Sequence, residues 1–146
     1  MKKTGWLTGC VIALLLAGCN GNTVYSSSKS LPEDGWNKDS VLSYQYAIAE
    51  DGQYDILLYV RHTENYPYQN MWLFVDNDTI EFYLADQRGR WLGNGVGRLK
   101  EMPVLYGQNK TLQKGEYTLH IQQGMREDML QGVSDIGVRI EKHQQE

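Results

Sequence analysis

Alternation of apolar and polar residues with a period of two recurs along this chain and constrains its fold more than any other feature. The pattern is clear over 41–48, 117–122 and 136–141. Successive side chains of a β-strand point to opposite faces, so this period indicates strands with one buried face. No stretch of adequate length after residue 36 repeats apolar residues at the helical spacing of three and four. The sequence therefore predicts an all-β fold.

The connections between the predicted strands favour two packed sheets. Runs 71–75 and 79–85 flank Asp76-Asn77-Asp78, which is typical of a hairpin turn. Run 54–61 is apolar at consecutive positions, so we expect a central strand covered on both faces. Strands at hairpin spacing, with Gly, Asn and Asp between them, pack economically as two antiparallel sheets. We predict an antiparallel β-sandwich of about eight strands, with a jelly-roll order as one way to connect them.

The N-terminus predicts a lipid anchor. Lys2 and Lys3 precede an apolar run from Trp6 to Ala17, and Leu16-Ala17-Gly18-Cys19 follows the pattern of a bacterial lipoprotein signal peptide. The apolar run is about a dozen residues long, too short to span a bilayer. We predict that residues 1–18 are removed and that Cys19 carries lipid, palmitate included. The alternatives are an uncleaved anchor and an ordinary secretory signal.

Composition divides the remaining chain and excludes some partners. The polar segment 19–35 is predicted to hold the lipidated cysteine and a flexible tether, 36–142 the β-sandwich domain, and 143–146 a polar tail. After loss of Lys2 and Lys3, 12 basic residues face 18 acidic ones, which leaves a formal charge of −6. That balance argues against a nucleic-acid partner. Only Cys19 remains of the two cysteines, so an intrachain disulfide is excluded.

No motif in the chain predicts catalysis, a metal or a cofactor. Gly93-Asn94-Gly95-Val96-Gly97 lacks the following helix of a phosphate-binding loop, so its glycines are predicted to permit a bulge or a close approach of strands. Asp76-Asn77-Asp78 lacks the glycine and glutamate that complete a calcium loop. No serine stands in a nucleophile elbow. The histidines share no metal-ligand spacing; they are His62, His120 and His143.

Aromatic and charged residues in predicted loops are the candidate contacts with a partner. Exposed aromatic rings beside Asp, Arg and Asn anchor protein partners or stack on sugars. The alternative is that these rings fill a small β core. The candidate contact residues are Tyr66, Tyr68, Asp86, Arg88, Trp91 and Arg126.

Several stretches in series resemble one family. Behind the lipoprotein signal, the order of these stretches resembles the GldH family of gliding motility-associated lipoproteins from Bacteroidetes. The resemblance implies a cell-envelope lipoprotein associated with the gliding machinery and with the type IX secretion system linked to it, and it implies no catalytic residues. The stretches are Gly35-Trp36 with Lys38-Asp39-Ser40, Asn65-Tyr66-Pro67-Tyr68-Gln69-Asn70, Ala85-Asp86 with Gly89-Arg90-Trp91-Leu92-Gly93 and Gly95, Gly115-Glu116-Tyr117, Gln123 with Met125-Arg126, and Gly132–Lys142.

The same resemblance implies an orientation and a modification. Surface-exposed lipoproteins of this phylum often carry acidic residues after the lipidated cysteine, whereas Asn20-Gly21-Asn22-Thr23 is uncharged and favours a periplasm-facing location. Asp39-Ser40-Val41 and Asp78-Thr79-Ile80 match the Asp-Ser/Thr-aliphatic pattern of O-glycosylation in these bacteria. We predict O-glycosylation at Ser40 and Thr79.

Together these observations predict a non-enzymatic, membrane-anchored lipoprotein. Its sandwich would bind other cell-envelope proteins of a gliding or secretion assembly. The alternative is a carbohydrate-binding lipoprotein of the outer membrane, which would present two or three aromatic rings in one exposed row or cleft.

Overall fold

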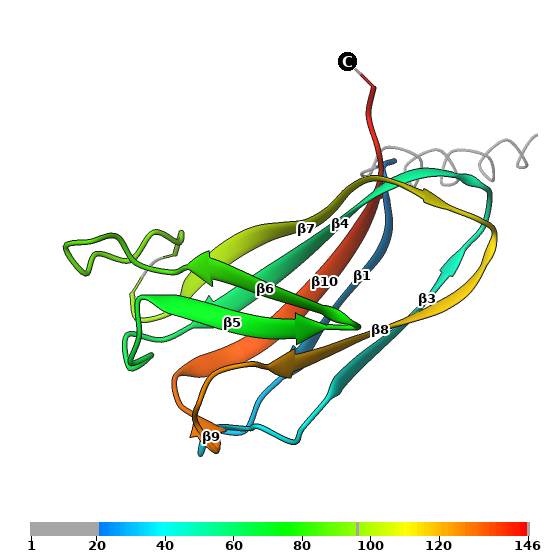
Figure 1. Ribbon diagram of the computed structural model, residues 1–146. Helices are drawn as coiled ribbons and strands as arrows, with labels where there is room; N and C mark the ends of the chain where they lie inside the picture. Colours follow the sequence, from blue (N-terminus) through cyan, green and yellow to red (C-terminus); the bar gives the residue numbers. More distant parts are fainter. Residues whose placement is uncertain (1–20, 96, 146) are drawn as a thin grey trace, which may run out of the picture.

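The alternating segments form the strands of two sheets packed face to face (Figure 1). Their inward side chains meet in one core between the sheets. The computed structural model describes residues 21–95 and 97–145. The strands are β1 (Thr23–Ser30), β2 (Trp36–Asn37), β3 (Leu42–Ile48), β4 (Gly52–His62), β5 (Asn70–Val75), β6 (Asp78–Tyr83), β7 (Lys100–Leu112), β8 (Gly115–Gln123), β9 (Met129–Leu130) and β10 (Val133–Lys142). One sheet has the order β1-β10-β4-β7 and the other the order β3-β8-β5-β6, with all neighbouring strands antiparallel. The predicted all-β sandwich is confirmed.

The chain passes from one sheet to the other at nearly every connection. Among the eight longer strands, only the β5–β6 hairpin joins neighbours within one sheet. The short strands β2 and β9 pair with each other. This crossing between sheets is consistent with the jelly-roll order, which stays a prediction. In the part of the chain that the structure describes, no helix has the length and apolar character needed to cross a membrane.

The core joins the inward faces of the two sheets. Tyr44 of β3 and Leu58 of β4 are fully buried. The Tyr44 hydroxyl donates a hydrogen bond of 2.7 Å to the carbonyl oxygen of Ile136 in β10, so the one polar atom of this ring is satisfied inside the core. Burial raises the pKa of Tyr44, which keeps the hydroxyl protonated and able to donate. The hairpin predicted at 76–78 is confirmed, with Asp76 at a φ of 52°.

The predicted flexible tether is wrong for Thr23–Ser30, which is eight residues of the segment 19–35. Residues Thr23–Ser30 form β1, which pairs with β10 and covers an edge that would otherwise be free. The Tyr25 ring packs 5.6 Å from that of Tyr46, and the Ser28 hydroxyl donates to Asp135 over 2.7 Å. The small polar serines gave no apolar alternation, so strand pairing was not evident in the sequence. Only residues 20–22 separate Cys19 from β1.

Strand β4 is central, as predicted, but only one of its faces is fully buried. Leu58 and Val60 face the core with no exposed surface, whereas Leu57 and Tyr59 on the other face are half-buried. The Arg139 guanidinium lies 4.7 Å from the centre of the Tyr59 ring and covers this outer face in place of a third layer. The run of consecutive apolar residues therefore predicted the central position of β4 correctly, but no second protein layer covers its outer face in the described part of the chain.

Candidate interaction surface

The loops that carry the candidate contacts lie at the end of the sandwich opposite the start of β1 (Figure 1). Strand pairing explains this placement. Thr23 pairs with Glu141 at one end of the first sheet, while His62 pairs with Lys100 and Val133 at the other. The segments that follow β4, β6 and β8 all leave from this second end, which we call the loop end. The start of β1 and the longest loops thus lie at opposite ends of the sandwich.

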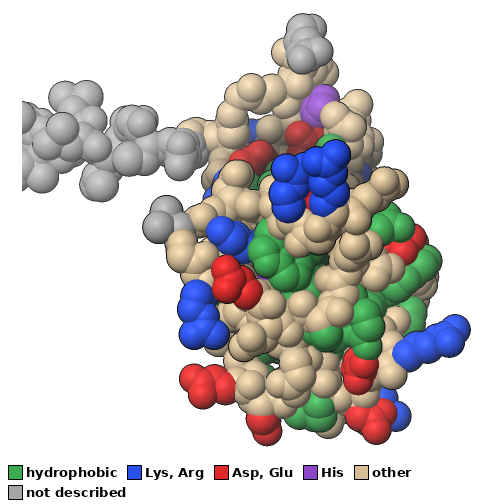
Figure 2. Space-filling view, turned by 90° about the vertical axis from the view of Figure 1, so that its left-hand side faces the viewer, with side chains coloured by type: hydrophobic (Ala, Val, Ile, Leu, Met, Phe, Trp, Pro, Cys, Tyr) green, Lys and Arg blue, Asp and Glu red, His purple; other side chains and the backbone are tan. Residues whose placement is uncertain are grey.

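An aromatic patch covers the outer face of β5 and β6 near the loop end. The exposed large aromatic side chains among residues 21–95 and 97–145 are Tyr68, Trp72, Phe74 and Tyr83, each 37–56% exposed. Trp72 and Phe74 alternate with Met71, Leu73 and Val75, which have no exposed surface, so both rings point outward from β5. We define the aromatic patch as these four residues together with Met125 and Arg126. Figure 2 faces the loop end and shows hydrophobic side chains along its right-hand side, flanked by charged ones.

Part of the patch is hollowed into a groove of about 550 Å³. The groove is lined by Tyr68, Asn70, Trp72, Gly124, Met125 and Arg126. Gly124 donates a backbone hydrogen bond to the carbonyl oxygen of Trp72, and a Cβ atom at Gly124 would lie 3.3 Å from both the Trp72 Cβ and the Phe74 ring. Because Gly124 has no side chain, the outer surfaces of Trp72 and Phe74 are left uncovered. A groove of this volume is large enough for a side-chain cluster or a small ligand.

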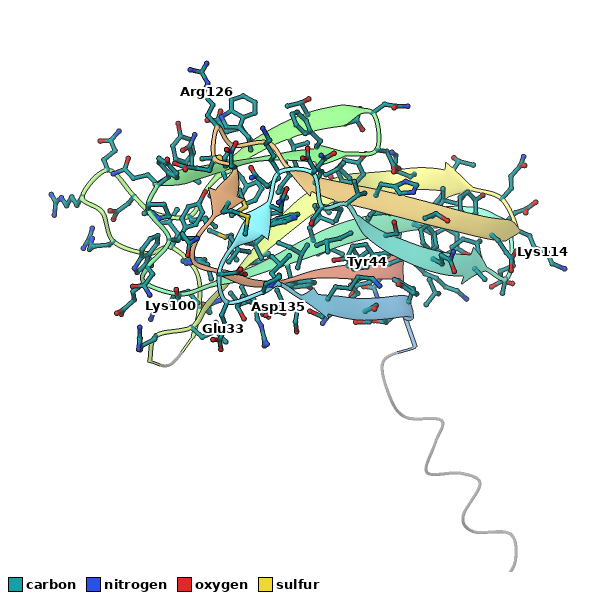
Figure 3. The ribbon with its side chains drawn as sticks, turned by 90° about the horizontal axis from the view of Figure 1, so that it is seen from below. Glu33, Tyr44, Lys100, Lys114, Arg126 and Asp135 are labelled. Carbon is teal, nitrogen blue, oxygen red and sulfur yellow. The ribbon has the colours of Figure 1, made fainter. Side chains whose placement is uncertain are left out.

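Arg126 supplies a positive charge at the rim of the groove. Its side chain points away from the body of the protein (Figure 3). Within 21–95 and 97–145, the ion pairs involve other residues, so this guanidinium is not neutralised by a neighbouring carboxylate. The neighbouring Glu127 instead accepts a hydrogen bond from the Tyr68 hydroxyl, and this bond raises the pKa of Tyr68. The groove thus combines aromatic rings with one unpaired cation.

Tyr66 positions the loop and presents almost no surface of its own. It is 3% exposed, and its hydroxyl donates to the Asn70 carbonyl oxygen over 2.6 Å. Its ring lies 6.1 Å from that of Tyr68 in a T-shaped arrangement. Burial raises the pKa of Tyr66, so the donating hydroxyl stays protonated. Of the two tyrosines predicted as contacts, the structure therefore offers Tyr68 to a partner.

The second predicted contact group forms a separate turn. The Asp86 carboxylate accepts hydrogen bonds from the backbone N–H of Arg88 and Arg90 and from the Arg90 side chain, each over 2.9 Å. The hydrogen bond from the Arg90 N–H contributes most to lowering the pKa of Asp86. Asp86 thus shapes the turn, and Arg88 is exposed on it. Trp91 is half-buried, with its ring 4.7 Å from that of His62.

The glycines that follow this turn permit the predicted close approach of backbone segments. Asn94 exchanges backbone hydrogen bonds with Glu101 over 2.9 and 2.7 Å. A Cβ at Gly93 would lie 2.6 Å from the Glu101 carbonyl oxygen. The prediction of a close strand contact, rather than a phosphate loop, is confirmed at these positions.

The remaining predicted sites have simpler placements. Ser40 and Thr79 are both exposed, so their hydroxyls are accessible, and O-glycosylation there stays a prediction. The signal peptide and Cys19 lie outside the described residues. Within the described part of the chain, no three His, Cys, Asp or Glu side chains gather as a metal ion requires.

Three aromatic residues of the patch were not among the contacts predicted from the sequence, namely Trp72, Phe74 and Tyr83. A signal for two of them exists, because Met71-Trp72-Leu73-Phe74-Val75 is apolar at every position. Such a strand has two apolar faces, and one of them stays exposed unless another layer covers it. Which face is covered depends on strand order and is not visible in the sequence.

Comparison with known proteins decides the family. The model of the GldH lipoprotein family matches residues 23–140. The chain belongs to the GldH lipoprotein family. A relative named gliding motility lipoprotein GldH, from Flavobacterium johnsoniae, is 31% identical over 97% of this chain and 98% of its own length. A GldH homologue from Christiangramia forsetii is also 31% identical, over 88% of this chain and 90% of its own. The family consists of lipoproteins, so membership places the chain at a membrane of the cell envelope.

Solved structures are similar only in part. A β-porphyranase of glycoside hydrolase family 86 from Bacteroides plebeius aligns with a TM-score of 0.40 and 14% identity, over 86% of this chain and 22% of the enzyme. Dimeric latent PorU from Porphyromonas gingivalis aligns with a TM-score of 0.37 and 9% identity, over 85% of this chain and 13% of that protein.

Proposed function

We propose that this chain is a non-enzymatic docking lipoprotein of the gliding machinery, which holds a protein partner at its aromatic patch. Lipid on Cys19 would anchor it, with the sandwich facing the periplasm. The names of the relatives support the motility role, and the uncharged residues after Cys19 support the orientation. The observation that carries the proposal is the gathering of the exposed aromatic rings in one patch with Met125 and Arg126.

The composition of the patch favours a protein partner. Tyr, Trp, Phe, Met and Arg are the residues enriched at the centre of protein interfaces, and Trp, Tyr and Arg dominate their binding energy. The patch also has a polar border, because the Asn70 amide donates to Glu81 over 2.8 Å beside the rings. A partner that buries Trp72 and neutralises Arg126 would gain both apolar burial and an ion pair.

Copurification from native membranes tests this proposal. Membranes are mildly crosslinked and solubilised in detergent, and the envelope proteins recovered with this chain are quantified. We expect Trp72→Ala to reduce recovery of the partner by about tenfold or more, as for a central interface residue. Leu105→Ala is the matched control, since Leu105 is 52% exposed on β7 and lies outside the patch. Recovery of the wild-type chain only as a free monomer, or equal recovery by Trp72→Ala, would contradict the proposal.

A second candidate function is glycan binding by the same face. Trp72 and Phe74 stand side by side on the outer face of β5, and the Asn70–Glu81 pair lies next to them. Rings in a row with hydrogen-bonding groups between them suit a saccharide. Affinity electrophoresis in polysaccharide gels separates the two candidates. Retardation that is lost in Trp72→Ala supports glycan binding, and unchanged mobility in every polysaccharide contradicts it.

A further inference from the structure

Strand β6 leaves an open edge beside the aromatic patch. It is the last strand of its sheet. The Leu84 N–H donates to the Gln69 carbonyl oxygen, so position 84 faces β5, and by alternation so do Phe82 and Ile80. The backbone groups of Thr79, Glu81 and Tyr83 therefore point away from the sheet. All three residues are exposed, and the edge presents donors and acceptors at strand spacing.

The other sheet edges carry protection that β6 lacks. Pro103 lies within the edge strand β7, whose pairing with β4 shifts register twice. The edges of β1 and β3 lie against each other, as the contact between the Tyr25 and Tyr46 rings shows. Proteins block edge pairing with Pro, Lys, bulges or a covering segment. Residues 78–83 contain no Pro, Lys or Arg, and their register with β5 is unbroken.

The inner face next to this edge is apolar, and the outer face combines polar and aromatic side chains. On the outer face, Tyr83 of the aromatic patch lies opposite Asn70, and Thr79 and Glu81 are the polar residues. On the inner face, Ile80 and Phe82 are only half-buried although they pack against the core. A strand added next to β6 would extend both surfaces at once, since its side chains alternate between them.

We propose that the partner docks by adding an extended strand to the free edge of β6, with apolar side chains at alternate positions. This inference rests on the proposed function, because it describes how the docked partner binds. Main-chain hydrogen bonds to Thr79, Glu81 and Tyr83 would supply affinity, and the rings of the patch would select the side chains above them.

A second copy of the chain does not fit as the occupant. Antiparallel pairing of β6 with itself around a two-fold axis turns one copy end for end. The start of β1 would then face opposite directions in the two copies. When the domain stands on the end where β1 begins, a lipid anchor three residues before β1 cannot reach the same membrane from both copies. The edge therefore fits a segment of a different protein.

Proline substitution on the outward side of the edge tests strand addition. Glu81→Pro removes an N–H that takes no part in pairing with β5, a position where edge strands tolerate proline. We expect Glu81→Pro to reduce recovery of the partner from crosslinked membranes by about tenfold or more, because a main-chain donor is lost. Glu81→Ala is the reference variant, since it keeps the N–H and removes only the carboxylate that accepts from Asn70. Glu81→Pro should lower recovery by about fivefold or more relative to Glu81→Ala, and this difference isolates the main-chain donor.

Hydrogen exchange keeps the proposal testable if Glu81→Pro unfolds. In the purified wild-type complex, the amides of Thr79, Glu81 and Tyr83 should exchange more slowly than in the free protein. Unchanged exchange at all three, or full recovery by a folded Glu81→Pro, overturns strand addition. Loss of the partner in Trp72→Ala together with full recovery by Glu81→Pro would leave the docking function standing and refute this mode of binding. A dimer of this chain that Glu81→Pro dissolves would refute it in favour of self-pairing.

Discussion

At the scale of single residues, two glycines separate the energetic cost of backbone strain from the cost of steric crowding. Gly132 and Gly89 both lie in the left-handed region, with φ of 86° and 81°. A Cβ at Gly132 would lie 2.5 Å from the Tyr66 Cα, whereas nothing lies within 4 Å of one at Gly89. Alanine in this region costs about 1–2 kcal/mol. Gly132 thus permits the close approach of the Tyr66 backbone, which lies in the loop that carries Tyr68.

We therefore expect Gly89→Ala to lower the free energy of unfolding by about 1 kcal/mol and Gly132→Ala by about 3 kcal/mol or more, since overpacking adds to strain. Urea denaturation of both variants measures the difference. Equal losses in the two variants would show that the backbone around Tyr66 yields to the added methyl group.

His62 makes stability depend on pH. Its ring is fully buried, and Nδ1 lies 3.0 Å from the Thr63 carbonyl oxygen. Nε2 has no hydrogen-bond partner among residues 21–95 and 97–145. Burial lowers the pKa of His62, and the charge of Lys100 acts in the same direction, against the Thr63 carbonyl. Below about pH 6.5 the unfolded chain binds a proton that the folded chain does not, so stability falls as the pH falls.

We expect His62→Asn, which keeps a donor near Nδ1 but does not titrate, to lose stability at neutral pH and to show a smaller further loss on acidification. Urea denaturation of both proteins at about pH 7.5 and about pH 5 measures this. The same acid-induced loss in variant and wild type would mean that His62 is not the group responsible.

At the scale of elements, β1 is an edge strand whose polar sequence lacks the alternation that predicts a strand. The Leu31 N–H donates to the Ser134 carbonyl oxygen, so by alternation Ser27 faces β10 and Ser26 faces away. We expect Ser27→Pro to cost about 2 kcal/mol, because it removes a ladder hydrogen bond and leaves its acceptor unpaired. Ser26→Pro, the matched control, should cost less than about 1 kcal/mol. Thermal unfolding measures the stability of both variants. Equal losses of stability would mean that the pairing of β1 with β10 does not contribute to the cooperatively unfolding structure.

The strands with one apolar face are those that the sequence predicted most directly. Strands β3, β8 and β10 alternate cleanly, and each lies where the pattern placed it. Strand β7 was not predicted, because Pro103 and Gly107 interrupt the alternation of Met102, Val104 and Tyr106. An edge strand tolerates such residues, since one side of its backbone is unpaired. Edges are thus where periodicity is least informative.

At the scale of the whole molecule, the candidate surface was only partly predictable. Tyr68 and Arg126 stood out as exposed residue types in loops, and the structure places both at one groove. Trp72 and Tyr83 belong to the same patch through the pairing of β5 with β6 and through the strand order of the sheet. Side-chain type marks individual contacts, but their assembly into a surface depends on long-range pairing that has no local signal.

The short N-terminal connection predicts how the domain stands on the membrane. If Cys19 is lipidated, three residues separate the lipid from β1, so the start of β1 stays within about 14 Å of the bilayer. Strand β4 alone spans about 36 Å, which places the loop end far from the lipid. Lys114 and Arg126 mark the near and far ends in Figure 3.

We expect a fluorophore on Lys114→Cys to be quenched by nitroxide-labelled lipid headgroups and one on Arg126→Cys to be unaffected, because the sandwich stands on the end where β1 begins. Both labels are specific, since the processed chain has no free thiol once Cys19 is lipidated. Ten inserted Gly and Ser residues after Asn20 form the control, and they should weaken quenching at Lys114 by lengthening the tether. Equal quenching at both positions would mean that the domain lies on its side, with the aromatic patch no longer held away from the bilayer.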